Sequence, residues 1–117
     1  MNKTLTLALA FGLCATTALA HAHLKAETPA AKADLVTAPK ALVLRFTEDV
    51  ALAFTGIKVT GPHKAAVKLG AGSLSSGDTV LTVPVAQTLA AGKYTVAWHA
   101  LSKDGHKTHG TYSFTVK

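Results

Sequence analysis

Short stretches in which apolar and polar residues alternate recur along most of this chain. Alternation with a period of two is typical of β-strands that bury one face. Turn-forming segments rich in Gly, Pro and Asp separate the stretches. This pattern of short alternating segments separated by turns predicts an all-β sandwich. The expected strand segments are 42–46, 57–59, 80–85, 96–98 and 112–116.

One segment refines the expected fold. Leu89-Ala90-Ala91-Gly92-Lys93-Tyr94 allows two interpretations. It is either a tyrosine corner, in which the Tyr94 hydroxyl bonds to upstream backbone as in immunoglobulin-like sandwiches, or a strand with an ordinary core tyrosine. In both, the period of two places Tyr94, Val96 and Trp98 on the inward face.

The first twenty residues have the features of a secretory signal peptide. Lys3 supplies the positive charge, residues 5–14 the apolar segment, and Ala18-Leu19-Ala20 the small-residue cleavage site. A membrane-spanning helix needs about 20 apolar residues, more than are present. We therefore expect a cleaved signal at 1–20 and one domain at 21–117, although Ala20-His21-Ala22 offers a second possible cleavage site. The only cysteine, Cys14, is removed with the signal, so the mature chain has no thiol ligand.

Charge and motifs exclude several classes of function. Without Lys3, eleven Lys and Arg oppose six Asp and Glu, but the basic residues are scattered, which indicates a solvated surface and no nucleic-acid partner. The chain shows no arrangement of a Ser-His-Asp triad, no paired carboxylates and no phosphate-binding glycine loop. Hydrolase and nucleotide-binding functions therefore have no support.

Histidines give the chemical signal. There are six, and four of them gather at the two ends, in His21-Ala22-His23 and in the segment from Asp104 through His106 to His109. The first and last strands of a sandwich can lie close together, so the clusters can meet. Cleavage after Ala20 would free an α-amine on His21, whose ordinary pKa of about 7.7 to 8 lets a divalent metal displace its proton. With Asp104 and His106, this gives three nitrogens and one oxygen, a tetragonal set that suits Cu(II), whereas Zn(II) prefers a tetrahedron.

A second arrangement uses the N-terminus alone. With a histidine third in the mature chain, the amine, two deprotonated backbone amides and His23 could hold Cu(II) in a square plane. The folded and tail sites share the α-amine, so they compete. We favour the folded site because it explains a histidine in first position. His23 could also join the folded site, and His109 could be an outer partner of it or a solvent-exposed residue; His63 is expected in an exposed loop and His99 on the outer face.

Five motifs are spread along the chain: His21-Ala22-His23-Leu24-Lys25, Leu44-x-Phe46-Thr47-Glu48, Gly92-x-Tyr94-x-Val96-x-Trp98, Asp104-Gly105-His106 and Gly110-Thr111-Tyr112-x-Phe114-x-Val116. Through these motifs, residues 21–117 resemble the periplasmic copper-resistance CopC family. The resemblance implies an immunoglobulin-like Greek-key β-sandwich or barrel of about seven strands that binds one Cu(II) per chain through His21 with its α-amine, Asp104 and His106. It places Glu48 near the copper as an outer partner. It also implies a non-enzymatic, monomeric periplasmic carrier or buffer in copper resistance or homeostasis, with an inner-membrane transporter of the CopD type as partner.

One family feature is missing. Some members carry a methionine-rich loop that binds Cu(I), but the corresponding stretch 59–69 contains His63 and no methionine, and Met1 is the only methionine in the chain. Soft Cu(I) prefers thioether or thiolate ligands. We therefore expect no separate Cu(I) site.

Two other classes of function compete with a copper carrier. An N-terminal histidine with a second histidine is also the histidine brace of copper monooxygenases, but Asp104 would fill a position that oxygen chemistry needs open. A structural immunoglobulin-like module with incidental histidines would bind metal weakly. The occurrence of histidine clusters at both ends favours the copper-binding protein.

Overall fold

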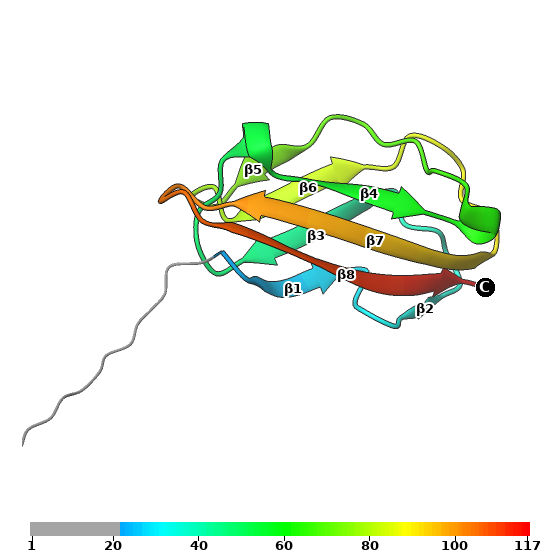
Figure 1. The fold of residues 1–117 in the computed structure, drawn as a ribbon. Helices are drawn as coiled ribbons and strands as arrows, with labels where there is room; N and C mark the ends of the chain where they lie inside the picture. Colours follow the sequence, from blue (N-terminus) through cyan, green and yellow to red (C-terminus); the bar gives the residue numbers. More distant parts are fainter. Residues whose placement is uncertain (1–21) are drawn as a thin grey trace, which may run out of the picture.

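Two four-stranded sheets pack face to face in the computed structural model, which describes residues 22–117 (Figure 1). One sheet has the order β1-β3-β6-β5, formed by β1 (Leu24–Thr28), β3 (Ala41–Phe46), β6 (Val80–Pro84) and β5 (Ser73–Ser75). The other has the order β2-β8-β7-β4, formed by β2 (Asp34–Leu35), β8 (Lys107–Val116), β7 (Gly92–Leu101) and β4 (Gly56–Thr60). Two 3-10 turns, η1 (Leu52–Phe54) and η2 (Pro62–Lys64), are the helical pieces of the described residues.

The alternating segments form the central strands and supply the core. Residues 42–46, 57–59, 80–85, 96–98 and 112–116 fall in β3, β4, β6, β7 and β8, except that β6 ends at Pro84. The predicted all-β sandwich is confirmed. Every second residue of these strands points between the sheets, where burial of apolar surface stabilises the fold. The largest fully buried side chains are Phe46, Phe114, Leu42, Leu44, Leu81, Val50 and Val96.

The tyrosine corner is present. The Tyr94 hydroxyl donates a 2.6 Å hydrogen bond to the carbonyl oxygen of Ala90, four residues earlier. The ring is buried and stacks on Phe114 with centroids 5.4 Å apart. This bond holds the turn that leads into β7, the strand whose far end carries the candidate site.

Three strands, β1, β2 and β5, have no counterpart among the predicted segments. β1 alternates poorly, because none of its five residues is fully buried. β2 has two residues and pairs in parallel with β8, through Asp34 and Leu35. Each lies at a sheet edge, where strands can be short and polar.

Three segments that are distant in sequence meet at one end of the sandwich. The start of β1, the end of β3 and the turn between β7 and β8 lie there together (Figure 1). β7 and β8 pair over ten residues each in one unbroken antiparallel register. Within the described part of the chain, no helix has the length and apolar character to cross a membrane.

Candidate metal centre

A tight turn at the end of the β7–β8 hairpin carries two of the predicted ligands. Ser102 donates its backbone N–H to the carbonyl oxygen of His106 at 2.9 Å, and the Gly105 N–H bonds to the Ser102 carbonyl at 2.9 Å. Gly105 has a φ of +96°, which glycine adopts without a Cβ clash. The turn therefore closes over Gly105 and holds Asp104 and His106 on either side of it.

Asp104 and His106 contact each other directly. Nδ1 of His106 lies 3.1 Å from Oδ1 of Asp104, and the hydroxyl of Ser102 also donates to that oxygen. Hydrogen bonds from Ser102 first and His106 second hold the pKa of Asp104 below its usual range. Asp104 is thus an anionic oxygen donor beside an imidazole, as the spacing predicted.

The N-terminal segment is tied to this end by two threonines. Ala22 is fully buried, and its carbonyl oxygen accepts a 2.7 Å hydrogen bond from Thr108 Oγ1. The His23 N–H donates to Thr47 Oγ1 at 2.9 Å, and the Thr47 N–H returns a 2.8 Å bond to the His23 carbonyl. The chain therefore enters the fold between the end of β3 and the start of β8.

These contacts place Ala22 and His23 at the end of the sandwich that carries the Asp104–His106 turn. Thr108, which holds Ala22, is two residues after His106. His21 lies outside the described residues, but its peptide bond keeps its Cα within about 3.8 Å of the Cα of Ala22. The role of His21 as a ligand stays a prediction, now with its neighbour anchored beside the Asp104–His106 turn.

Glu48 lies in the loop between the two halves. It is exposed and directly follows Thr47, which binds His23. The next residue, Asp49, accepts a 3.2 Å hydrogen bond at its carbonyl from the Lys103 N–H, in the Asp104 turn. Glu48 is therefore at the correct end for an outer partner, and this role also stays a prediction.

The other histidines are distributed around the surface. His23 is exposed at the site end, and His63 is exposed in η2 with a φ of +61°. His99 is exposed on the outer face of β7, as expected. His109 pairs with His99 across the hairpin and lies on the opposite side of β8 from Thr108, so the strand alternation directs it away from Ala22.

Three positioning residues were missed by sequence reasoning: Ser102, Thr108 and Thr47. Each is a hydroxyl residue that fixes a backbone or side-chain group of the site. A signal for Thr108 was available, because it shares the inward parity of Tyr112 and Phe114, where a polar side chain needs a hydrogen-bond partner. Nothing in the sequence pattern marked Ser102, which is 3% exposed.

Residues 22–117 alone do not supply a full ligand set, because no three His, Cys, Asp or Glu side chains in this range converge on one point. Asp104 and His106 provide an oxygen and a nitrogen. This pair fits a copper centre only with further donors. The predicted ligands on His21, its imidazole and the α-amine expected after cleavage, would be of the required kind.

Fold and site together define a small β-sandwich protein with a candidate metal centre where its N-terminal segment meets the closing hairpin. The chain belongs to the CopC family, since the CopC domain model matches residues 24–117. Protein YobA of Escherichia coli K12 is 48% identical over 99 residues, covering 84% of this chain and 80% of YobA. Copper resistance protein C of Escherichia coli is 35% identical, covering 100% of this chain and 98% of that protein.

Solved structures agree with this assignment. CopC from Methylosinus trichosporium OB3b superposes with a TM-score of 0.76 at 32% identity, covering 83% of this chain and 94% of that one. PcoC of Escherichia coli, described as a methionine-rich copper resistance protein, gives a TM-score of 0.74 at 32% identity, covering 84% of this chain and all of PcoC. The predicted family and fold are confirmed.

Proposed function

We propose that this protein is an exported Cu(II)-binding protein that carries or buffers copper in the periplasm as part of copper resistance. One ion per chain is held by the α-amine and imidazole of His21, by Asp104 and by His106. The observation that carries the proposal is the hydrogen bond from Thr108 to Ala22, because it brings the residue next to His21 against the strand that begins one residue after His106. Copper resistance proteins among its relatives support the choice of metal.

The fold favours this site over the tail site. A tail site needs the backbone amide of His23 deprotonated and bound to copper. In the structure that N–H is a donor to Thr47 Oγ1, and the His23 carbonyl accepts from Thr47. Copper in the tail would have to displace the bond donated by the His23 N–H, whereas the folded site does not require this. Hydrogen bonds within a folded protein contribute about 1 kcal/mol each.

Cu(II) is the expected oxidation state because the donors are nitrogen and oxygen. The neighbour PcoC is described as methionine rich, but this chain has Met1 alone, ahead of the expected cleavage site. Binding is favoured over oxygen chemistry because Asp104 lies 3.1 Å from His106 and would share the metal with it. The receiving partner we propose is an inner-membrane copper transporter of the CopD type, and the carrier acts as a monomer.

The test is Cu(II) binding by the processed protein, followed by competition titration and electron paramagnetic resonance. We expect one tight tetragonal signal per chain. Asp104→Ala and His106→Ala should each weaken binding by more than the roughly 10- to 100-fold that loss of an outer partner produces. Asp34→Ala and His63→Ala, at exposed positions outside the site, serve as matched controls and should bind as the parent does. Unchanged affinity in the first two variants would refute the proposal.

A further inference from the structure

Two histidines stand directly opposite each other on the outer face of the β7–β8 hairpin. His99 and His109 are register partners in the antiparallel ladder, and both are exposed. Both face away from the core, since their strand neighbours Ala100 and Thr108 point inward. They belong to neither the Asp104–His106 contact nor the anchoring of Ala22.

The hydrogen-bond pattern shows which kind of pair they form. Antiparallel partners alternate between hydrogen-bonded and non-hydrogen-bonded pairs. Ser102 donates its N–H to the carbonyl of His106, so that pair is hydrogen-bonded, and the register runs unbroken from there. Three steps along the ladder, His99 and His109 are therefore a non-hydrogen-bonded pair.

Leu101 supports this assignment independently. Its N–H bonds to Thr55 Oγ1 at 3.2 Å, and its carbonyl accepts from the Ala51 N–H at 2.9 Å, so both groups point away from β8. His99, two residues earlier on the same strand, has the same orientation. Non-hydrogen-bonded partners have Cα atoms about 4.5 Å apart and the closest side chains in a sheet. Two imidazoles at this spacing can bind one ion.

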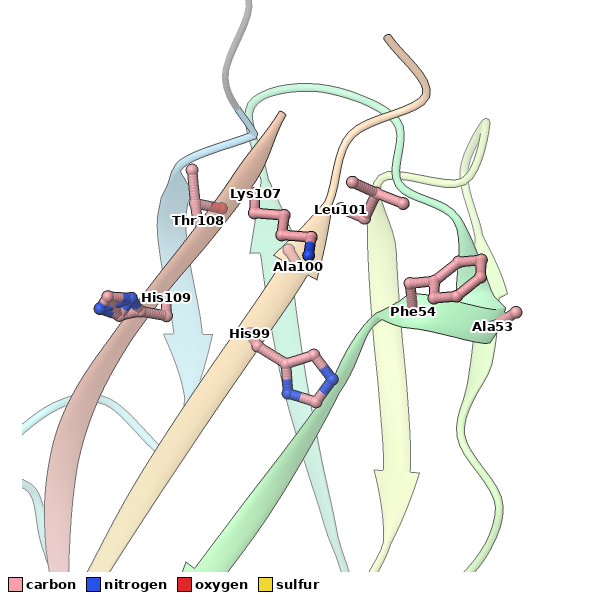
Figure 2. A pocket seen from close by; sticks show the side chains of 8 residues that line it. All are labelled: Ala53, Phe54, His99, Ala100, Leu101, Lys107, Thr108 and His109. Carbon is pink, nitrogen blue, oxygen red and sulfur yellow. The ribbon is translucent and has the colours of Figure 1, made fainter. Parts of the chain in front are cut away.

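The surroundings leave room for a metal. His99 and His109 line one open cavity of about 580 Å³ together with Phe54 and Lys107 (Figure 2). The position across from His99 on β4 is Gly56, which has no side chain to block the ring. In Figure 2 the two rings turn to opposite sides of the pair, His99 toward β4 and His109 away from β7. Exposed side chains exchange rotamers in picoseconds to nanoseconds, so both rings can swing together.

We propose that His99 and His109 form a second metal site, which takes a divalent ion that prefers imidazole, such as Cu(II) or Zn(II). Two imidazole nitrogens bind the ion, and water completes its coordination. The site is weaker than the Asp104–His106 centre because it offers two donors and Lys107 places a positive charge in the same cavity. It is also independent of that centre, and an exposed site suits an ion that is held briefly.

The experiment titrates the mature protein with Cu(II) beyond one equivalent. Calorimetry counts the binding events, and nuclear magnetic resonance follows the imidazole signals of each histidine. The second equivalent should broaden the signals of His99 and His109. His99→Ala and His109→Ala should each reduce the stoichiometry from two ions to one, while the exposed control His63→Ala keeps two.

Three outcomes would overturn the second site: no second binding event, a second event that survives both variants, or loss of the first event in His109→Ala. A second event that disappears only in His23→Ala would assign the ion to the tail instead. The resonance signals report on each histidine separately. Failure of the Asp104–His106 centre would therefore be seen as an unchanged His106 signal at the first equivalent of Cu(II), independently of the result for His99 and His109.

Discussion

Thr108 donates a hydrogen bond from its hydroxyl to the carbonyl oxygen of Ala22, joining residues 86 positions apart in the chain across 2.7 Å. Ala22 is fully buried, so this carbonyl cannot turn to bulk water. The bond sets where the chain enters the fold, and hence where the preceding histidine can reach. One hydroxyl thus connects the last strand of the sandwich to the residue that follows the proposed N-terminal copper ligand.

Thr108→Val tests this connection. Valine keeps the shape and strand preference but leaves the Ala22 carbonyl without its donor, which should lower the free energy of unfolding by about 1 to 3 kcal/mol. Cu(II) affinity should fall as well, because the N-terminal segment is released. Thermal unfolding and competition titration measure the two effects. Thr111→Val, on the outer face of the same strand, is the control. Equal copper affinity in Thr108→Val and the parent would exclude the proposed role.

Thr47→Val should redistribute copper between the two N-terminal arrangements. It removes the acceptor of the His23 N–H, so the backbone amide becomes easier to deprotonate for the tail site. We expect a second Cu(II) signal by electron paramagnetic resonance at one equivalent of copper. The double variant Thr47→Val with His23→Ala should lose that signal. A spectrum identical to the parent's would show that this hydrogen bond does not hold the tail in the fold.

Ser102→Ala should change both the pKa of Asp104 and the Cu(II) affinity of the turn. The Ser102 hydrogen bond is the main cause of the lowered pKa of Asp104, so this pKa should rise in the variant. Lowering the pKa of a carboxyl group in the folded state stabilises the fold at pH values above the ordinary pKa of Asp. This stabilisation is lost as the pH falls through the lowered pKa. The Ser102→Ala variant should therefore lose this stabilisation at a higher pH than the parent.

At neutral pH Asp104 is ionised in parent and variant alike, so any loss of copper affinity in Ser102→Ala reflects positioning. We expect a decrease of roughly 10- to 100-fold, as for other outer partners of metal ligands. A carbon-detected pH titration of Asp104 and a copper titration give the two readouts. Ser75→Ala, exposed in β5, should alter neither. A pKa that stayed low in Ser102→Ala would assign the shift to another group.

Gly105→Ala separates backbone strain from metal geometry. Gly105 and Gly77 both have positive φ, +96° and +68°, and an added Cβ would meet no atom within 4 Å at either position. Each alanine should therefore lower stability by a similar amount, about 1 to 2 kcal/mol. Copper affinity should fall in Gly105→Ala alone, because only that turn carries Asp104 and His106. Equal copper affinities in the two variants would contradict this.

The sequence predicted the central strands well because their burial is one-sided. Leu42, Leu44 and Phe46 alternate with polar or half-buried neighbours, and all three are buried. β1 and β2 were not predicted, since they lie at sheet edges, where pairing depends on the partner strand more than on a local pattern.

The sequence predicted that Asp104 and His106 lie on the same side of the chain, but it did not predict the residues that hold the site together. Asp104 and His106 were recognised from their spacing, which reflects local chain geometry and needs no tertiary information. The bonds from Thr47 and Thr108 to the N-terminal segment join residues 24 and 86 positions apart, and no local pattern encodes such contacts. His109 was weighed as an outer partner of this site, but the alternation of β8 places it opposite His99.

The most direct test of the copper centre compares two chains that differ by one residue at the N-terminus. The first begins at His21, and the second carries Ala20 ahead of it. All imidazoles and Asp104 are the same in both, but the α-amine of His21 becomes a peptide nitrogen in the second. Competition titration should show Cu(II) bound at least about tenfold more weakly by the longer chain, a loss of about 1.4 kcal/mol or more. Equal affinities would show that the free amine of His21 is not a ligand.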